Sequence, residues 1–293
     1  MLDCTKEFKE VKIFSAVFWY IFSMFIVILF SSVIDTIKHS NLSNNNNLLS
    51  LYSSTLFILI LFYKFKVNKN KLFILIEDYT NKIHFKEIIE VVGTQLCLSM
   101  GLSLLLIGII YFLFPNVLND LLSQSSVDEI STYKDFFIVF LVSVICAPIM
   151  EELLFRAIIF KRISRRFNIY FAMIVSSLVF GLLHMELAII GAFLFGIACC
   201  ILYIKYKNIL ISMTIHFLNN LLAILPQLDI NSTPNNSPIT ASDAKSSLIC
   251  GSILFIIGMI FFIRFIVKNK KFLKDGFSPN SNNELYSNNT YHH

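Results

Sequence analysis

Three short runs of the sequence carry acid, base and amide side chains at helical spacing. In the first run, Glu151 and Glu152 are followed by Arg156, which lies four residues after Glu152. Residues four apart share one face of a helix, and an acid is favoured on the N-terminal side, so this pair would neutralise itself. Glu151 is turned roughly 100° away and has no local partner. A buried carboxylate without a partner can accept and donate protons, as a general acid–base catalyst must.

The other two runs supply imidazoles. Phe180 precedes His184 by four residues and would support its ring, while His216 precedes Asn220 by four residues. Together with Glu151 these groups suffice for hydrolysis. The carboxylate deprotonates a water, and a histidine holds that water or donates a proton. An amide or imidazole stabilises the oxyanion that forms. Taken singly, each run also has a structural interpretation, as an ion-pair network or as polar contacts between helices.

The composition requires lipid around these residues. Hydrophobic residues make up 56% of the chain and charged residues 15%, with a mean hydropathy of +0.71; soluble domains carry about 45–50% apolar and about 25% charged residues. This excludes a soluble enzyme, a secreted disulfide scaffold and a disordered chain. A charge at the centre of a bilayer costs about 2.5–3.5 kcal/mol, so charged motifs inside apolar segments indicate a functional site.

Hydropathy predicts an all-α fold, a polytopic transmembrane helical bundle of about eight spans. A spanning helix needs roughly 20 mostly apolar residues. The segments that qualify are 13–34, 47–63, 88–114, 135–159, 168–185, 187–204, 208–226 and 246–267.

The distribution of Lys and Arg between the spans predicts how the bundle is oriented in the membrane. Twenty Lys and Arg residues flank the spans on one side, against Lys38, Lys134 and Lys245 on the other, so the positive-inside rule places both termini in the cytoplasm. We therefore expect a multi-pass protein of the cell membrane, with membrane lipid as a partner. The lysines fall in short clusters between spans and not on one face, so no nucleic-acid partner is expected.

The predicted spans fall into three regions. Residues 1–134 hold three N-terminal spans with their loops, residues 135–226 hold four spans that carry all the motifs, and residues 227–293 hold an external loop, the last span and a polar cytoplasmic tail. The segment 72–87 mixes apolar and charged residues and is predicted to lie along the inner interface. Gly191 and Gly196 would let the sixth span approach its neighbours closely.

At the motif residues the chain resembles the CPBP intramembrane metalloprotease family, the CAAX prenyl protease or Abi type. The family pattern is Glu-Glu-x-x-x-Arg, then Phe-x-x-x-His, then His-x-x-x-Asn, on successive membrane helices. The matching positions are Glu151-Glu152-x-x-x-Arg156, Phe180-x-x-x-His184 and His216-x-x-x-Asn220. Each motif is short, and it is their order and spacing over roughly residues 135–225 that make the resemblance specific.

The resemblance implies a membrane peptidase, a hydrolase acting on a membrane-associated peptide or protein substrate. Glu151 would activate water with the help of His184, and His216 and Asn220 would form the oxyanion side. The supporting residues would be Glu152, Arg156 and Phe180. Eukaryotic relatives remove the last three residues of prenylated proteins, and some bacterial members are tied to bacteriocin immunity or to membrane-protein processing. The abundance of Lys over Arg, with many Asn and Ile, fits an AT-rich bacterial genome, so the expected membrane is a bacterial plasma membrane.

A divalent metal such as zinc is an open question at the level of the sequence. A catalytic zinc has three protein ligands and an open position, and the candidates are Glu151, His184 and His216. If all three bound zinc, the nearby base would be Glu152, which Arg156 engages. No His-Glu-x-x-His helix is present. The residues therefore favour a metal-independent, glutamate-activated water.

Two other classes of function stay open. A non-catalytic membrane protein, such as an immunity factor that binds a partner, would use the same residues structurally. A proton-coupled transporter would use intramembrane Glu and His as a proton relay. The sequence shows no internal repeat and no pair of broken helices in matching halves, which argues against a transporter.

Overall fold

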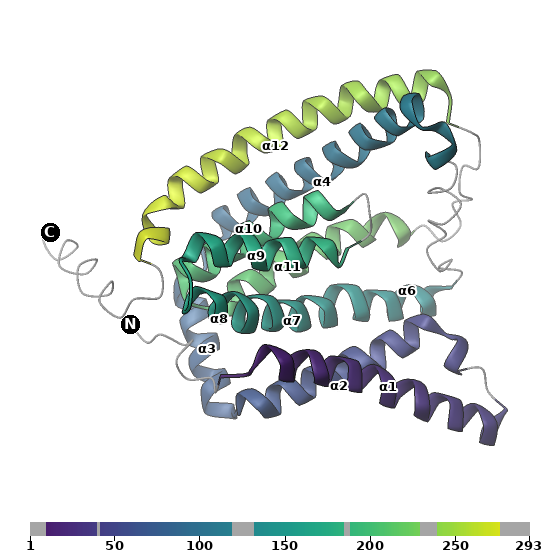
Figure 1. The fold of residues 1–293 in the computed structure, drawn as a ribbon, viewed down its shortest axis with the longest axis vertical. Helices are drawn as coiled ribbons and strands as arrows, with labels where there is room; N and C mark the ends of the chain where they lie inside the picture. Colours follow the sequence, from purple (N-terminus) through teal and green to yellow (C-terminus); the bar gives the residue numbers. More distant parts are fainter. Residues whose placement is uncertain (1–9, 40–41, 119–131, 185–187, 229–238, 276–293) are drawn as a thin grey trace, which may run out of the picture.

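Long apolar helices form the whole of the described structure, a computed structural model that covers residues 10–39, 42–118, 132–184, 188–228 and 239–275 (Figure 1). Seven helices of these ranges are long and apolar enough to cross a membrane. They are α1 (Ile13–Lys38), α2 (Asn46–Phe65), α4 (Phe85–Leu113), the continuous helix Tyr133–Ser164, α10 (Ile189–Tyr206), α11 (Ile209–Ile224) extended by the 3₁₀ turn η5 (Leu225–Leu228), and α12 (Ala241–Asp275). The described ranges contain no β-strand.

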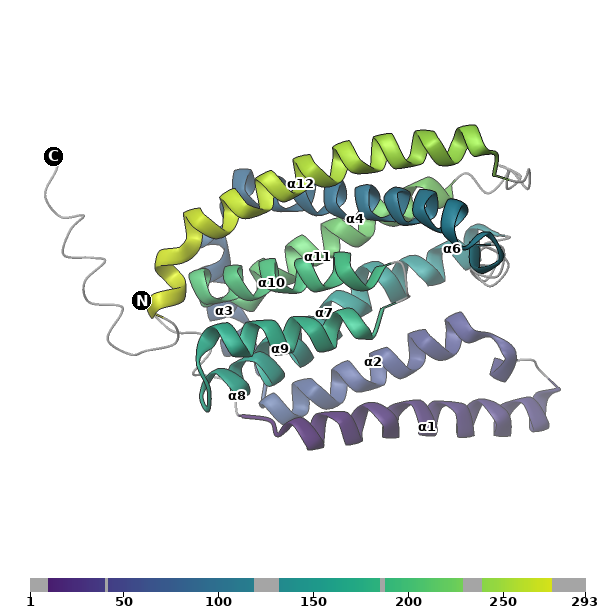
Figure 2. The same cartoon turned by 45° about the horizontal axis from the view of Figure 1, so that its top comes forward.

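An eighth apolar helix, α9 (Ile169–Leu182), has 14 residues. At 1.5 Å per residue it is about 21 Å long, shorter than the roughly 30 Å hydrocarbon core. Hydropathy extends this span to residue 185, but the helix ends earlier because the chain turns at Leu183 and His184. Seven long helices with α9 confirm an all-α membrane bundle of about eight spans. The start of α1 and the end of α12 lie at the same end of the bundle (Figures 1 and 2).

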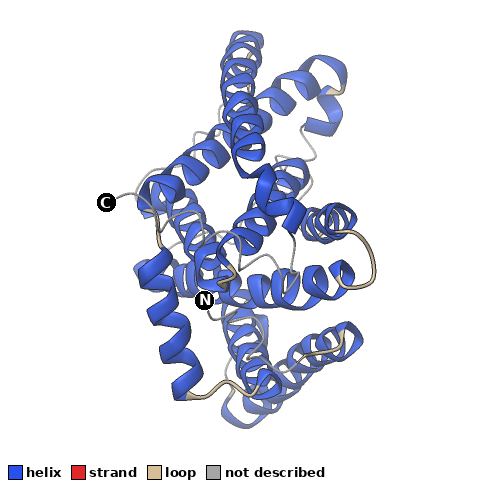
Figure 3. Cartoon of the chain, turned by 90° about the vertical axis from the view of Figure 1, so that its left-hand side faces the viewer, coloured by secondary structure: helices blue, strands red, loops and turns tan. Residues whose placement is uncertain are grey.

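The short helix α3 (Lys69–Lys82) joins α2 to α4 at this end of the bundle. Figure 3 looks along the bundle and shows α3 running across it, whereas the long helices are seen nearly end-on. The Asn68 side chain accepts a hydrogen bond from the Lys71 amide, which caps the start of α3. This crosswise helix occupies the segment that was predicted to lie along the inner interface.

The helix that carries the first motif is irregular. It runs through α6 (Tyr133–Phe140), the π-helical segment η2 (Leu141–Cys146), α7 (Ala147–Glu152), the π-helical segment η3 (Leu153–Phe160) and α8 (Lys161–Ser164). Stretches of π-helix are rare and often mark functional sites. Here they flank the helical turn that holds Glu151 and Glu152 on both sides.

Glycines set the closest helix contacts. A Cβ added at Gly101 of α4 would lie 2.5 Å from the Phe255 amide nitrogen of α12, so these two backbones nearly touch. A Cβ at Gly196 of α10 would lie 2.9 Å from Ser177 Cβ of α9, and one at Gly191 would lie 3.1 Å from Ser99 Oγ of α4. This confirms the close approach expected of the sixth predicted span.

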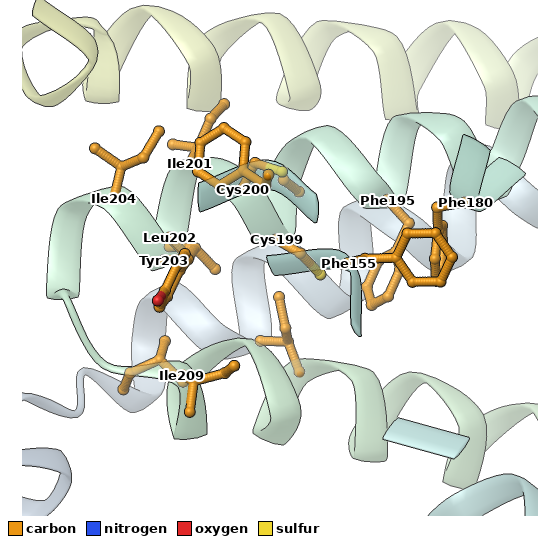
Figure 4. Close-up of a cluster of buried hydrophobic side chains, with 14 of the residues drawn as sticks. Phe155, Phe180, Phe195, Cys199, Cys200, Ile201, Leu202, Tyr203, Ile204 and Ile209 are labelled. Atoms are coloured by element: carbon orange, nitrogen blue, oxygen red, sulfur yellow. The ribbon is translucent and has the colours of Figure 1, made fainter. Parts of the chain in front are cut away.

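The core of the bundle surrounds α10. Most of this helix is buried, whereas α1 exposes most of its surface, as a lipid-facing helix does. The buried side chains of α10 form one cluster with those of the neighbouring helices (Figure 4). The labelled members of this cluster are Phe155, Phe180, Phe195, Cys199, Cys200, Ile201, Leu202, Tyr203, Ile204 and Ile209. The candidate site lies where this core meets α7 and α11.

Candidate active site

A buried ion-pair network joins the first and third motifs. Arg156 Nη1 lies 3.0 Å from Glu152 Oε1, which confirms the pairing expected from their spacing. The same carboxylate oxygen accepts a hydrogen bond of 3.0 Å from His216 Nδ1 on α11. The side chains of Glu152 and Arg156 are 0% and 1% exposed. Two buried charges are tolerable here because each has an opposite partner.

Glu151 occupies the position that its spacing predicts, away from Arg156. Its Oε2 lies 3.7 Å from His216 Nε2, so the two nitrogens of one imidazole face two different carboxylates. Glu151 Oε2 is buried and has no hydrogen-bond partner, although the side chain as a whole is 22% exposed. An unsatisfied buried carboxylate oxygen requires an explanation, and a catalytic role is one.

Aromatic rings enclose the charged groups. The Arg156 guanidinium lies 4.5 Å from the centre of the Phe180 ring, a cation–π contact. Phe180 also packs against the rings of His184 at 4.5 Å and His216 at 5.9 Å, measured between centroids. Figure 4 shows Phe180 beside Phe155 and Phe195 in the core. Phe180 thus contacts both histidines and the arginine, a wider role than the expected support of His184 alone.

His184 lies in the turn after α9 and not on the helix itself. Its Nδ1 donates a hydrogen bond of 2.8 Å to the Phe180 carbonyl oxygen, which leaves Nε2 as the acceptor nitrogen of the neutral ring. His184 and His216 lie near the same level, because both rings pack against Phe180 and both line one cavity.

His184 and His216 line one cavity of about 140 Å³. Asn219 and Asn220 of α11 also line it, and the remaining walls come from α4, α9 and α10. The cavity can hold water, because it is larger than a water molecule and presents several polar groups. Glu151 is not among the lining residues, but its Oε2 lies 3.7 Å from Nε2 of His216, which is one of them.

Three polar residues of α4 line the cavity and were missed at the level of the sequence. They are Gln95, Ser99 and Ser103, each four residues after the previous one. Gln95 is 5% exposed, and its Nε2 donates hydrogen bonds to Ser99 Oγ at 2.8 Å and to the Gly191 carbonyl oxygen at 3.0 Å. Their four-residue spacing within an apolar span was the signal that could have found them.

Asn220 has two defined hydrogen bonds. Its Nδ2 donates to the Ser143 carbonyl oxygen at 2.8 Å, and its Oδ1 accepts from Asn219 Nδ2 at 3.2 Å. Asn220 therefore contacts the backbone of the helix that carries Glu151, in addition to lining the cavity. Its expected role towards an oxyanion stays a prediction.

The three candidate metal ligands do not form one ligand group. Glu151 and His216 are close, but His184 approaches them only through the shared cavity and the Phe180 ring. Across the described ranges, no three His, Cys, Asp or Glu side chains lie close enough to hold a metal ion. Glu152 is engaged by both Arg156 and His216. In this arrangement the residues do not fit a three-ligand zinc site.

The fold and the site define a multi-pass helical membrane protein in which acid, imidazole and amide groups from separate helices meet inside the bundle. Residues 133–222 match the model of the family described as type II CAAX prenyl endopeptidase, Rce1-like. This match confirms the resemblance to the CAAX prenyl protease, or CPBP, family. It covers the stretch that carries all three motifs.

Two bacterial proteins are similar to part of the chain. The protein of Bacillus subtilis (strain 168) named "Putative membrane peptidase YdiL" is 30% identical over 114 residues, which are 39% of this chain and 45% of that protein. The UPF0177 protein YvdC of Lactococcus lactis subsp. lactis (strain IL1403) is 27% identical over 132 residues, 43% of this chain and 50% of that protein. The chain thus matches about half the length of these curated relatives. No solved structure matches it.

Proposed function

We propose that this protein is an intramembrane endopeptidase that hydrolyses a peptide bond of a membrane-associated substrate through a water activated by Glu151. The observation that carries the proposal is the pair formed by Glu151 and His216. A buried carboxylate oxygen without a hydrogen bond lies 3.7 Å from an imidazole nitrogen, and that imidazole is fixed from its other side by Glu152. Glu152 Oε2 is also buried without a hydrogen-bond partner, so it is the 22% exposure of Glu151 and its place beside an imidazole, not the unsatisfied oxygen alone, that support the proposal.

The groups present are sufficient for the reaction. Glu151 takes a proton from a water whose oxygen attacks the peptide carbonyl carbon, so the C–O bond forms and the carbonyl oxygen becomes an oxyanion. In its doubly protonated form His216 donates Nδ1–H to Glu152 and Nε2–H to that oxyanion, which it stabilises. Glu151 then delivers its proton to the amide nitrogen as the C–N bond breaks. The products are a new carboxylate and a free amine.

His184 has a supporting part in this scheme. With Nδ1 donated to the Phe180 carbonyl oxygen, its Nε2 is the acceptor nitrogen. His184 shares the cavity with His216 and so holds and orients the attacking water. The scheme uses a water activated by Glu151 and routes no step through a metal ion.

The substrate is a polypeptide that reaches the site from within the membrane. The family match and the bacterial relatives support a protease of the CAAX type. Two forms of substrate are compatible with that chemistry, a prenylated CAAX-type C-terminus and a bacteriocin-related peptide. Both are amphipathic or lipidated, so both partition into the bilayer that surrounds the site.

Glu151→Gln tests this proposal, because it keeps the size of the side chain and removes the base. Membranes from cells that carry the wild type and the variant are compared by peptide mass spectrometry. We expect peptides that form with the wild type to be absent with the variant. The matched control is Glu90→Gln on α4, which removes a 51% exposed carboxylate near Lys268 and should leave cleavage intact.

If Glu151→Gln inserts normally and the same peptides still form, Glu151 is not the base and the proposal fails. A non-catalytic immunity or partner-binding protein would tolerate this substitution and His184→Ala. Proton-coupled flux in proteoliposomes that is lost with Glu151→Gln would favour a transporter instead.

A further inference from the structure

The helix that carries Glu151 changes its hydrogen-bond register just before that residue. In the π-helical segment η2 the bonds run from residue i to residue i−5, and the Ala147 amide accordingly donates to the Val142 carbonyl oxygen. The next bond in this register would run from the amide of residue 148 to the Ser143 carbonyl oxygen. Residue 148 is proline, which has no amide hydrogen.

Another helix supplies the missing donor. Asn220 Nδ2 of α11 donates to the Ser143 carbonyl oxygen at 2.8 Å, the bond that Pro148 cannot make. In a bilayer a backbone carbonyl without a partner costs several kcal/mol, so such groups are satisfied inside the protein. The Asn220 amide is itself oriented, because its Oδ1 accepts from Asn219 Nδ2 at 3.2 Å.

This bond is one of two that connect the same pair of helices. Asn220 lies one turn after His216 on α11, and Ser143 lies about two turns before Glu152. The second connection is His216 Nδ1 to Glu152 Oε1 at 3.0 Å. One hydrogen bond lets two helices pivot about it, whereas two bonds separated along the helices fix their relative rotation. That rotation sets the distance between His216 Nε2 and Glu151 Oε2.

We propose that Asn220 is a positioning residue, whose amide replaces the missing amide hydrogen of Pro148 and thereby fixes His216 against Glu151. The inference rests on the proposed function and deepens it. It differs from the role that the family resemblance implies, in which Asn220 stabilises the oxyanion directly. It also accounts for Pro148, because a proline at this position leaves the Ser143 carbonyl free to accept a hydrogen bond from α11.

A double-mutant cycle tests the positioning role, because Pro148→Ala can restore a donor to the Ser143 carbonyl within its own helix without restoring the bond between the two helices. Asn220→Ala removes the amide, and Pro148→Ala gives residue 148 an amide hydrogen that can donate to Ser143. The four corners are the wild type, each single variant and the double variant. Each is purified as the full chain, and kcat and KM are measured with a farnesylated CAAX-type fluorogenic peptide.

We expect Asn220→Ala to lower kcat by about 100-fold with KM nearly unchanged, since small misplacements of catalytic groups have effects of this size. Its midpoint of thermal unfolding should fall by about 2–4 °C. The double variant should regain most of the lost thermal stability, because the Ser143 carbonyl has a donor again, but not the lost kcat, because the bond between the two helices is still absent. Asn220→Ala combined with Pro226→Ala is the matched control, because Pro226 is an exposed proline beyond the end of α11, and it should restore neither.

A readout without substrate completes the test. The ¹⁵N resonances of His216, assigned with His216→Gln, should shift in Asn220→Ala and stay shifted in the double variant. If the wild type cleaves no peptide, the proposed function fails, but the resonances still decide whether Asn220 positions His216. The positioning role is overturned if the double variant regains the wild-type kcat and His216 resonances although the helices are unlinked, or if Asn220→Ala lowers kcat without changing the His216 resonances.

Discussion

His216 Nδ1 donates to Glu152 Oε1 at 3.0 Å, which joins two helices through residues that are 64 positions apart in the sequence. The bond fixes the orientation of the ring, since Nδ1 is the nitrogen that donates. It also explains why two adjacent glutamates are present. Glu152 is bound to the histidine and to Arg156, which leaves Glu151 free for chemistry.

Removal of Glu152 should destabilise the fold more than any loss of surface charge. Glu152→Ala leaves Arg156 as a buried charge without its partner, which costs about 3–5 kcal/mol. The free energy of unfolding in detergent, measured by denaturant titration, checks this. Glu90→Gln is the control and should change stability by less than about 1 kcal/mol, because its ion pair with Lys268 is exposed. Equal effects of the two substitutions would contradict the network.

Phe180→Leu should show how much the aromatic ring contributes. Leucine keeps most of the buried volume but removes the cation–π contact with Arg156, worth about 2 kcal/mol when desolvated. We expect a corresponding loss of stability in the same titration. Leu178→Ala on the same helix is the control, since Leu178 is 46% exposed and faces outward. A larger effect at Leu178 would show that the Phe180 ring is not central.

Gln95→Leu should reduce activity through the water in the cavity. The substitution removes the donor to the Gly191 carbonyl oxygen and replaces a polar wall by an apolar one. Loss of this hydrogen bond costs about 0.5–1.5 kcal/mol, and a drier cavity lowers kcat. Thr94→Val is the control, because the Thr94 hydroxyl donates to the Glu90 carbonyl oxygen of its own helix. Equal kcat values for Gln95→Leu and the wild type would exclude this part of α4 from the site.

Gly101→Ala should lower the stability of the protein and Gly93→Ala should raise it, although both glycines lie on α4. A Cβ at Gly101 would lie 2.5 Å from the Phe255 amide nitrogen, so α4 and α12 must separate, at about 1–3 kcal/mol. Gly93 has nothing within 4 Å, and alanine there gains up to about 1 kcal/mol of helix propensity. Thermal unfolding of both variants tests this. A stable Gly101→Ala would contradict the close packing of these helices.

The sequence could predict what depends on local helix geometry. The pairing of Glu152 with Arg156 follows from residues four apart on one helix, and the separate direction of Glu151 follows from the same geometry. The approximate spans follow from hydropathy. The division into three regions stays a prediction, and the cavity draws on the first region as well as the second.

What depends on the contact of separate helices could not be predicted. The bond between His216 and Glu152 and the lining of the cavity by Gln95 are set by packing, which periodicity within one segment does not specify. The short length of α9 escaped hydropathy because Leu183, in the turn, is as apolar as the helix before it. His184 lies just beyond the end of α9 and lines the cavity.

Cleavage in ¹⁸O-labelled water tests the central claim most directly. The purified full chain is incubated with a farnesylated CAAX-type peptide. The mass of the product that carries the new C-terminus is then measured by mass spectrometry. Hydrolysis by a water activated by Glu151 predicts one ¹⁸O atom in the new carboxylate with the wild type and no product with Glu151→Gln. Unlabelled product from the wild type, or labelled product formed at the wild-type rate by Glu151→Gln, would contradict it.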